Sequence, residues 1–324
     1  MIQIRTDLAI EARELYKERV KQEIPGVEVK REEEEDYTVT RVKIANKTGE
    51  SKMGKPVGNY ITIESQGLRK ADQDLKDKIS TVLAKELKQL LNLDKSTKTL
   101  VVGLGNWHVT PDALGPKVVE KVFVTRHFFK AYKKDEDETM ANVSVISPGV
   151  MGLTGIETSE IIKGIVEKTN PNLVIAIDAL ASRKTERVST TIQISDVGIN
   201  PGSGVGNKRK ALNKQYLGVP VVAIGVPTVV DAATMVNDTM DLILSEMKKQ
   251  SEKGSRFYSL LEGMDDEDKH SLIREVLTPY MGNLMVTPKE VDDLIDDLSV
   301  VIANGLNISL HPGIDLKDVN RYLN

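Results

Sequence analysis

The sequence contains no cysteine, which excludes disulfide bonds, thiolate zinc sites and cysteine nucleophiles. Histidine is scarce, and a multi-histidine metal site is not expected from four scattered residues: His108, His127, His270 and His311. No apolar run approaches the roughly 18 residues that a membrane span needs. We therefore expect a protein without a metal, a cofactor or a membrane segment.

The chain begins without the basic region and apolar core of a secretory signal, so we expect it to stay in the cytoplasm. Its net charge of −4 argues against a general nucleic-acid binder, because binding to phosphate backbones depends on clustered Lys and Arg. With 324 residues, of which 40% are apolar, the chain is long enough for a large buried core.

The N-terminal part predicts a helix, three strands and a second helix. Apolar residues near helical spacing indicate a helix within residues 7–23. The alternating segments GVEVKRE, DYTVTRVKI and NYITIES predict half-exposed antiparallel strands, and the charged run 31–36 is expected to be a solvated turn. An amphipathic pattern then predicts a helix over residues 71–93.

From residue 98 the pattern becomes one of near-continuous apolar runs separated by helical stretches: TLVVGL, VSVISP, NLVIAI and PVVAIG. Such runs are typical of parallel strands buried on both faces. A helix over residues 229–249 is expected to close this core, with further helices at 270–281 and 289–306.

We predict an α/β fold in which helices flank a mainly parallel central sheet, with an N-terminal antiparallel β addition and C-terminal helices. We expect one continuous domain, with a core at about 96–250 and a helical C-terminal part at about 251–310.

The stretch VVGLGNWHVTPDALGP suggests a first candidate site residue, Asp112. Its glycines do not have the G-x-G-x-x-G spacing of a dinucleotide-binding turn. Thr110 and Pro111 form a typical helix start, which puts Asp112 at the second helical position, where the helix dipole favours a carboxylate. Taken alone, Asp112 is equally well explained as a surface acid that favours a helix.

A second candidate, Asp178, directly follows the apolar strand in NLVIAIDALASRK. Functional crevices in parallel sheets lie outside the carboxyl ends of the strands, so Asp112 and Asp178 converge if their strands are neighbours. Two adjacent carboxylates share one proton, which supplies a general acid and a general base around one water. This pair suits amide hydrolysis without a covalent intermediate.

Two glycine-rich loops are candidates for lining the same crevice. In residues 147–160, Gly149 and Gly152 would allow a substrate backbone to approach, although a tight connection explains them equally well, and Thr158 or Ser159 would cap the next helix. In residues 196–210, Lys208 and Arg209 would attract an acidic peptide, although a solvated loop is the better explanation. Asn106 and His108 are further candidates for site-lining residues.

The chain resembles the germination protease family of spore-forming bacteria, from about Arg5 to about Leu310, in six stretches: GLGNWHVTPDALGP, SPGVMGLTGIETSEII, NLVIAIDALASR, TTIQISDVGINPGSGVGNKRK, GVPTVVDA and NLMVTPKEVDDLI. The resemblance implies an endopeptidase of the forespore and spore core that degrades small, acid-soluble spore proteins during germination. It also implies a homotetramer made as an inactive zymogen, in which the two catalytic aspartates are Asp112 and Asp178.

The resemblance also implies self-processing near the N-terminus. Family substrates are cut after an acidic residue that is followed by an apolar residue, Ala and a later Glu, and residues 6–11, TDLAIE, have this form. We therefore expect cleavage between Asp7 and Leu8, which divides the chain into a prosegment of residues 1–7 and a mature peptidase of residues 8–324.

Two other functions fit parts of the sequence. The hydrogenase maturation endopeptidases have a similar G-N-x(5)-[DE] and strand-Asp pattern, in which the acids help to bind a metal. Their third ligand, a histidine, has no evident counterpart here, which favours the aspartic mechanism. A non-catalytic nucleotide-binding module is the other alternative, although neither glycine loop has the required spacing.

Overall fold

The structure is a computed structural model that describes residues 6–20, 23–70, 72–91, 93, 96–132, 139–202, 210–250 and 284–323. The expected helix at 270–281 and the candidate residues Lys208 and Arg209 lie outside these ranges. In the part of the chain that is described, no helix is long and apolar enough to cross a membrane.

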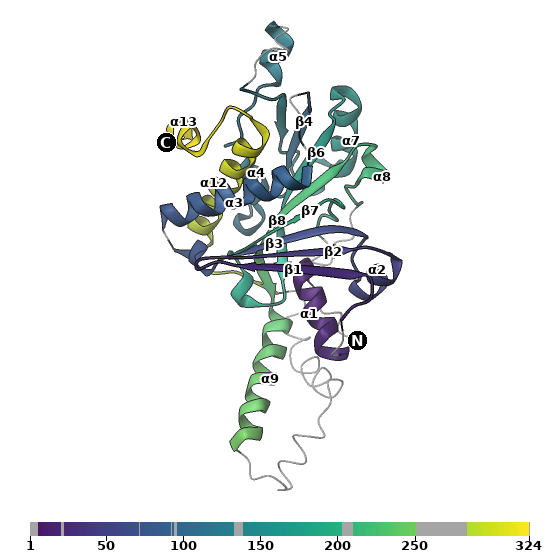
Figure 1. Cartoon of the computed structure of the whole chain (residues 1–324), viewed down its shortest axis with the longest axis vertical. Coiled ribbons are helices and arrows are strands. Elements are labelled where there is room, and N and C mark those ends of the chain that lie inside the picture. Colours follow the sequence, from purple (N-terminus) through teal and green to yellow (C-terminus); the bar gives the residue numbers. More distant parts are fainter. Residues whose placement is uncertain are drawn as a thin grey trace.

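A single mixed sheet forms the centre of the molecule (Figure 1). Its strands follow the order β1-β2-β3-β7-β8-β6-β4-β5, with β9 paired to β8. The strand bounds are β1 Val27–Glu33, β2 Thr38–Ile44, β3 Gly58–Glu64, β4 Thr99–Gly103, β5 Val143–Ile146, β6 Leu173–Ser182, β7 Thr191–Ser195, β8 Val221–Asp231 and β9 Met285–Val286. The neighbours β5, β4, β6 and β8 are parallel, and β1, β2, β3 and β7 continue the sheet in antiparallel pairs. The predicted fold class is therefore confirmed.

Strand β7 is one of the elements that were not expected from the sequence. Its five residues, TIQIS, are all buried, and it pairs with β3 on one side and β8 on the other. This strand therefore joins the antiparallel N-terminal part to the parallel core in one sheet.

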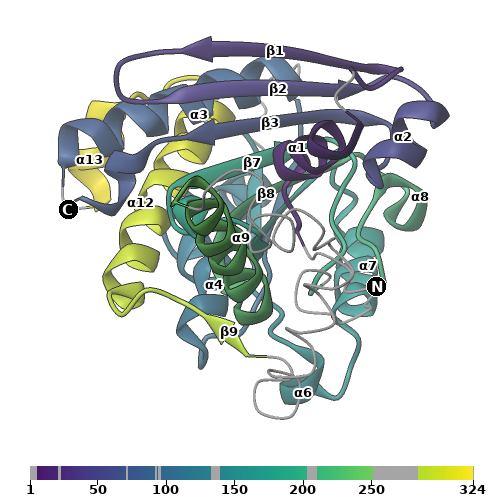
Figure 2. The ribbon, with the colours of Figure 1, turned by 90° about the horizontal axis from the view of Figure 1, so that it is seen from below.

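Helices cover both faces of the sheet (Figures 1 and 2). The helix bounds are α1 Ala9–Val20, α2 Lys47–Met53, α3 Gln73–Leu91, α4 Leu114–Val119, α5 Arg126–Tyr132, α6 Met151–Thr154, α7 Thr158–Thr169, α8 Lys214–Leu217, α9 Ala232–Gln250, α12 Val291–Leu310 and α13 Leu316–Leu323. Three short 3-10 helices are η1 Gln66–Arg69, η2 Thr110–Asp112 and η3 Thr185–Arg187.

The alternation of side chains along each strand produces two separate cores. In β6, Ile175 and Ile177 join the apolar cluster under α3, α4 and α12, whereas Val174 and Ala176 join the cluster under α7 and α8. Helix α12 therefore belongs to the main core, where its apolar stripe packs beside α3.

Two expectations from the sequence are corrected here. Arg31–Glu33 of the charged run form the end of the edge strand β1, and only the rest of the run turns, because charged side chains are well tolerated at a sheet edge. The helix after Pro227 does not close the core. Strand β8 continues to Asp231, so α9 starts beyond the body of the sheet and extends away from it, with Leu242 72% exposed (Figure 1).

The end of α12 is fixed by a fully buried histidine, His311. The Phe123 carbonyl lies 3.2 Å from Nε2, and the Ala141 N–H donates to Nδ1 over 3.2 Å. Since a carbonyl only accepts, Nε2 carries the proton and Nδ1 is the acceptor. Burial lowers the pKa of His311, although the Phe123 hydrogen bond works in the opposite direction.

We predict that His311 makes the protein less stable as pH falls below about 6.5. In that range an unfolded histidine takes up a proton that the folded one resists, so the free energy of unfolding decreases with falling pH. His311→Gln should flatten this dependence and cost about 1–3 kcal/mol at pH 7.5. Urea unfolding between pH 5.5 and 7.5 measures both effects, and the exposed His108→Gln serves as the control. An unchanged slope in His311→Gln would contradict the prediction.

Candidate active site

The turn after β4 brings the backbone of Gly105 against that of Asp112. Gly105 has φ +115°, and a Cβ at this position would lie 1.9 Å from the Asp112 carbonyl oxygen. The Asn106 N–H donates to the same oxygen over 3.0 Å. Gly105 thus allows two segments of the same turn to pack closely. This structural role agrees with the absence of the glycine spacing that a dinucleotide-binding turn requires.

Asp112 lies in a 3-10 turn, not at the second position of an α-helix. Residues Thr110–Asp112 form η2, and the residue that precedes this turn is Val109. No side chain caps η2, and α4 starts only at Leu114. The expectation that Thr110 is an N-cap is therefore wrong. The Asp112 N–H donates to the Val109 carbonyl over 2.8 Å, so backbone bonds hold the turn without help from the Thr110 hydroxyl.

Asp178 lies inside β6 and not after it. Strand β4 ends at Gly103, which pairs with Ile177, whereas the pairing of β6 with β8 continues to Ser182. Asp178 is therefore the first residue of β6 beyond the end of β4. Asp178 is only 5% exposed, and its Oδ1 accepts a hydrogen bond from the Ala179 N–H over 3.0 Å.

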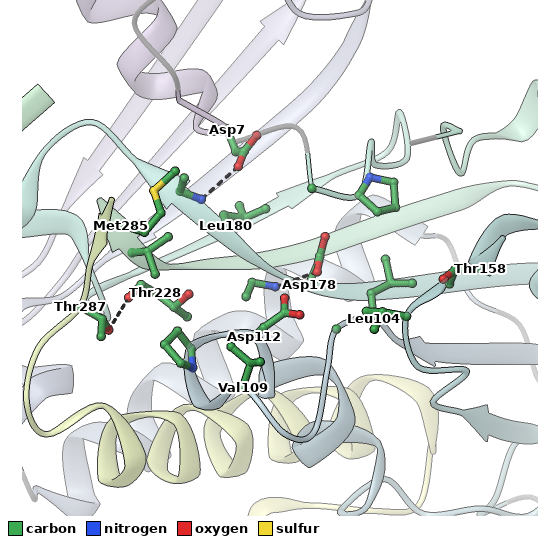
Figure 3. Close-up of a pocket in the computed structure, with 18 of the residues that line it drawn as sticks. Asp7, Leu104, Val109, Asp112, Thr158, Asp178, Leu180, Thr228, Met285 and Thr287 are labelled. Carbon is green, nitrogen blue, oxygen red and sulfur yellow. Dashed lines mark hydrogen bonds between the residues drawn. The ribbon is translucent and has the colours of Figure 1, made fainter. Parts of the chain in front are cut away.

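A cavity of about 320 Å³ contains both aspartates (Figure 3). Figure 3 shows the Asp112 side chain directed from η2 toward the Asp178 carboxyl group on β6. Gly149 and Thr158 form one wall, and Met285 and Thr287 at β9 belong to another. The convergence expected from the sequence is present in the fold.

The other candidate lining residues divide into two groups. Gly149 lines the cavity, but Gly152, Asn106 and His108 are not among its lining residues. Asn106 shapes the turn instead, because its side-chain oxygen accepts from the His108 N–H over 3.0 Å.

The expected capping of α7 by Thr158 or Ser159 is wrong. Glu157 precedes the helix without a side-chain cap, and Thr158 is the first helical residue. The Thr158 hydroxyl donates to the Gly149 carbonyl over 3.1 Å, so it fastens the glycine loop to the start of α7.

The N-terminal segment, for which self-processing was expected, enters this cavity. Asp7 lines the cavity together with Asp112 and Asp178. It pairs with Ala181 of β6: the Asp7 N–H donates to the Ala181 carbonyl over 3.1 Å, and the Ala181 N–H donates to the Asp7 carboxylate over 3.0 Å (Figure 3).

Glu11 anchors this segment four residues further along the chain. Its carboxylate is 1% exposed and accepts from the backbone N–H groups of Arg183, over 2.7 Å, and Lys184, over 3.0 Å. The Arg187 guanidinium lies 3.4 Å from Glu11 and also binds Glu14 of α1 over 2.6 Å. Burial tends to raise the pKa of Glu14, but Arg187 lowers it on balance.

The donor groups at this site bear on whether it could hold a metal ion. Among the described residues, no three His, Asp or Glu side chains come together in a way that would hold a metal ion. The cavity contains Asp7, Asp112 and Asp178, but they do not form such a cluster.

Comparisons with known proteins agree on one family. A family model described as germination protease matches residues 6–261 and 245–323. A germination protease of Caldanaerobacter subterraneus subsp. tengcongensis is 55% identical over 320 residues, covering 99% of this chain and 98% of the relative. Those of Clostridium perfringens and Bacillus cereus are 54% and 49% identical, covering 100% and 98% of this chain and 100% and 96% of the relatives.

Among solved structures, a [NiFe] hydrogenase maturation protease, HycI from Thermococcus kodakarensis, matches with a TM-score of 0.33 and 17% identity, covering 69% of this chain and 98% of that one. The sequence relatives define the class of the protein, which is an endopeptidase. Within that class, the chain belongs to the germination protease family.

We predict that Gly105→Ala destabilises the protein by about 3 kcal/mol, because the added Cβ meets the Asp112 backbone at a φ that disfavours alanine. Gly152→Ala is the matched control, since nothing lies within 4 Å of a Cβ there. It should be neutral or slightly stabilising within α6. Thermal unfolding compares the two, and equal midpoints would contradict the proposed purpose of Gly105.

Proposed function

We propose that this protease starts the degradation of small, acid-soluble spore proteins during germination and that Asp112 and Asp178 activate the attacking water. Membership of the germination protease family supports the spore role. The observation that carries the mechanism is the shared cavity, into which η2 and β6 bring the two carboxyl groups from distant parts of the chain.

In this mechanism the two aspartates divide the acid and base roles. Two carboxyl groups at one site share a proton, so one is ionised while the other is protonated. The ionised group accepts a proton from water as the water oxygen attacks the peptide carbonyl carbon. The protonated group then supplies a proton to the leaving amide nitrogen.

The same site would cut the chain itself between Asp7 and Leu8, which makes residues 1–7 a prosegment and the uncut chain a zymogen. Support comes from Asp7, which lines the cavity together with Asp112 and Asp178. We further propose a homotetramer located in the forespore and spore core, with no direct binding to nucleic acid.

Asp112→Asn and Asp178→Asn should each slow cleavage of small, acid-soluble spore proteins and of the Asp7–Leu8 bond by at least about 10³-fold, because an amide performs neither acid nor base catalysis. Mass spectrometry of the new N-terminus at Leu8 and gel analysis of an added substrate protein provide the rates. The exposed Asp74→Asn is the control. Wild-type rates in either cavity variant would exclude the aspartate pair.

The alternative, a metal-dependent endopeptidase, is tested by removal of metal. If the aspartates act without a metal, dialysis against EDTA and then against metal-free buffer should leave the rate within about twofold of the untreated enzyme. A large loss of activity that added Zn²⁺ restores would instead make the two acids metal ligands.

A further inference from the structure

The carbonyl oxygen of Asp7 is held by two side chains that the mechanism above does not use. Lys55 Nζ donates to this oxygen over 2.9 Å, and Gln193 Nε2 donates over 3.2 Å. The oxygen belongs to the peptide bond between Asp7 and Leu8. One charged and one neutral donor therefore converge on the bond that we expect the enzyme to cut.

The sheet register brings this oxygen to the same place as Asp178. Asp178 of β6 and Gln193 of β7 both pair with Gly225 of β8, one from each side. Neighbouring strands are about 4.8 Å apart, so the two Cα atoms lie about 10 Å from one another. Gly225 has no side chain of its own, and the Leu180 side chain packs against it. A second cavity of about 120 Å³ is lined by Asp7, Lys55, Asp178 and Gln193 among others.

Gln193 holds the chain on both sides of the same bond. Its Nε2 donates to the Asp7 carbonyl, and its Oε1 accepts from the Ala9 N–H over 2.6 Å. Leu8, between these two residues, is fully buried and packs with Leu180 of β6. The Asp7–Leu8 bond is thus fixed in position relative to β6 and β7.

Lys55 follows directly after helix α2. The helix ends at Met53, and Gly54 caps it in the left-handed conformation (φ +62°) just before Lys55. The ammonium group also donates to the Thr6 carbonyl over 3.3 Å. Burial lowers the pKa of Lys55, and the charges of Asp7 and Glu11 work against this effect.

We propose that Lys55 and Gln193 are catalytic residues that stabilise the negative charge developing on the scissile carbonyl oxygen, which for self-processing is that of Asp7. This inference rests on the proposed function. Water adds to the Asp7 carbonyl carbon, and the C=O π electrons move to the oxygen that both side chains bind. The C=O bond then re-forms, the C–N bond to Leu8 breaks, and the Leu8 nitrogen takes the proton from the acidic aspartate. The products are the new α-carboxyl group of Asp7, which ionises by releasing its proton to solvent, and a new amino terminus at Leu8.

A simpler role for Lys55 would be to tether the prosegment in the cavity. The two roles predict different effects on the rate of the chemical step when the ammonium group is removed. Loss of a tether would leave the chemical step unchanged or release the segment, whereas loss of an oxyanion donor slows the chemical step by about 10²–10³-fold.

The first test measures self-cleavage of the full chain by the appearance of the Leu8 amino terminus. Lys55→Met should slow it by about 10²–10³-fold. Lys47→Met removes a lysine of α2 that pairs with Glu50 at the surface, and it should remain within about twofold of the wild type. Gln193→Glu is a second variant, because it retains the acceptor for Ala9 but replaces the donor to Asp7, and it should also slow the reaction.

The absence of cysteine permits a rescue that shows whether the terminal ammonium group itself, and not only a side chain of that length, is required. In Lys55→Cys the new thiol is the only one in the chain, so bromoethylamine converts it alone into a side chain with a terminal ammonium. We expect this treatment to raise the rate of self-cleavage at least about tenfold above that of untreated Lys55→Cys. Iodoacetamide, which adds a neutral amide, should restore less.

The outcomes separate this inference from the function on which it rests. Wild-type rates in folded Lys55→Met and Gln193→Glu, or equal rescue by both reagents, would overturn the role of these residues while the aspartate mechanism stands. A wild-type chain that never cuts the Asp7–Leu8 bond, or that cuts it equally well without Asp112 and Asp178, would overturn the proposed function itself and this inference with it.

Discussion

The site depends on one feature of the sheet: β6 and β8 continue to pair after β4 has ended, with a shift of register between Leu180 and Ala181. Because Gly103 is the last residue of β4, no strand in the described part of the chain pairs with the edge of β6 on that side from Asp178 onward. The turn that carries Asp112 occupies the space above this edge, and Asp7 pairs with Ala181 further along it. Two acids and a segment of the chain's own N-terminus thus meet along the part of β6 that extends beyond β4.

Buried charge determines how firmly the N-terminus is held there. Arg187 is 5% exposed, and it binds Glu14 of α1, Glu64 of β3 and, at 3.4 Å, Glu11. A buried charge is costly unless it is paired, so removal of Arg187 would take from all three carboxylates the positive charge that they share. The network therefore fixes α1 against β3 and η3, and the residues just before α1 have little freedom to lie elsewhere than along β6.

Elements of the fold could be predicted where the pattern of apolar residues within the element itself indicated a helix or a strand. The buried strands at TLVV and NLVIAI and the amphipathic pattern of α3 were identified because apolar periodicity reflects the surroundings of each element. Strand β7 was not assigned, although its five residues, TIQIS, alternate between polar and apolar side chains as a strand does. The start of α9 was predicted wrongly, because a helix pattern does not indicate where the preceding strand ends. The cap of α7 was predicted wrongly, because the Thr158 hydroxyl donates to the carbonyl of Gly149, a contact that the local sequence does not specify.

The sequence alone determined the types of element, the fold class and the two aspartates that follow or interrupt apolar runs, because burial patterns and turn residues are local properties. It also determined the family, since the relatives match over nearly the full chain. Only the tertiary structure decided that Asp7, Lys55 and Gln193 surround one peptide bond beside Asp178. That arrangement arises from the shared pairing of Asp178 and Gln193 with Gly225, and strand register between distant segments is not encoded in any one of them.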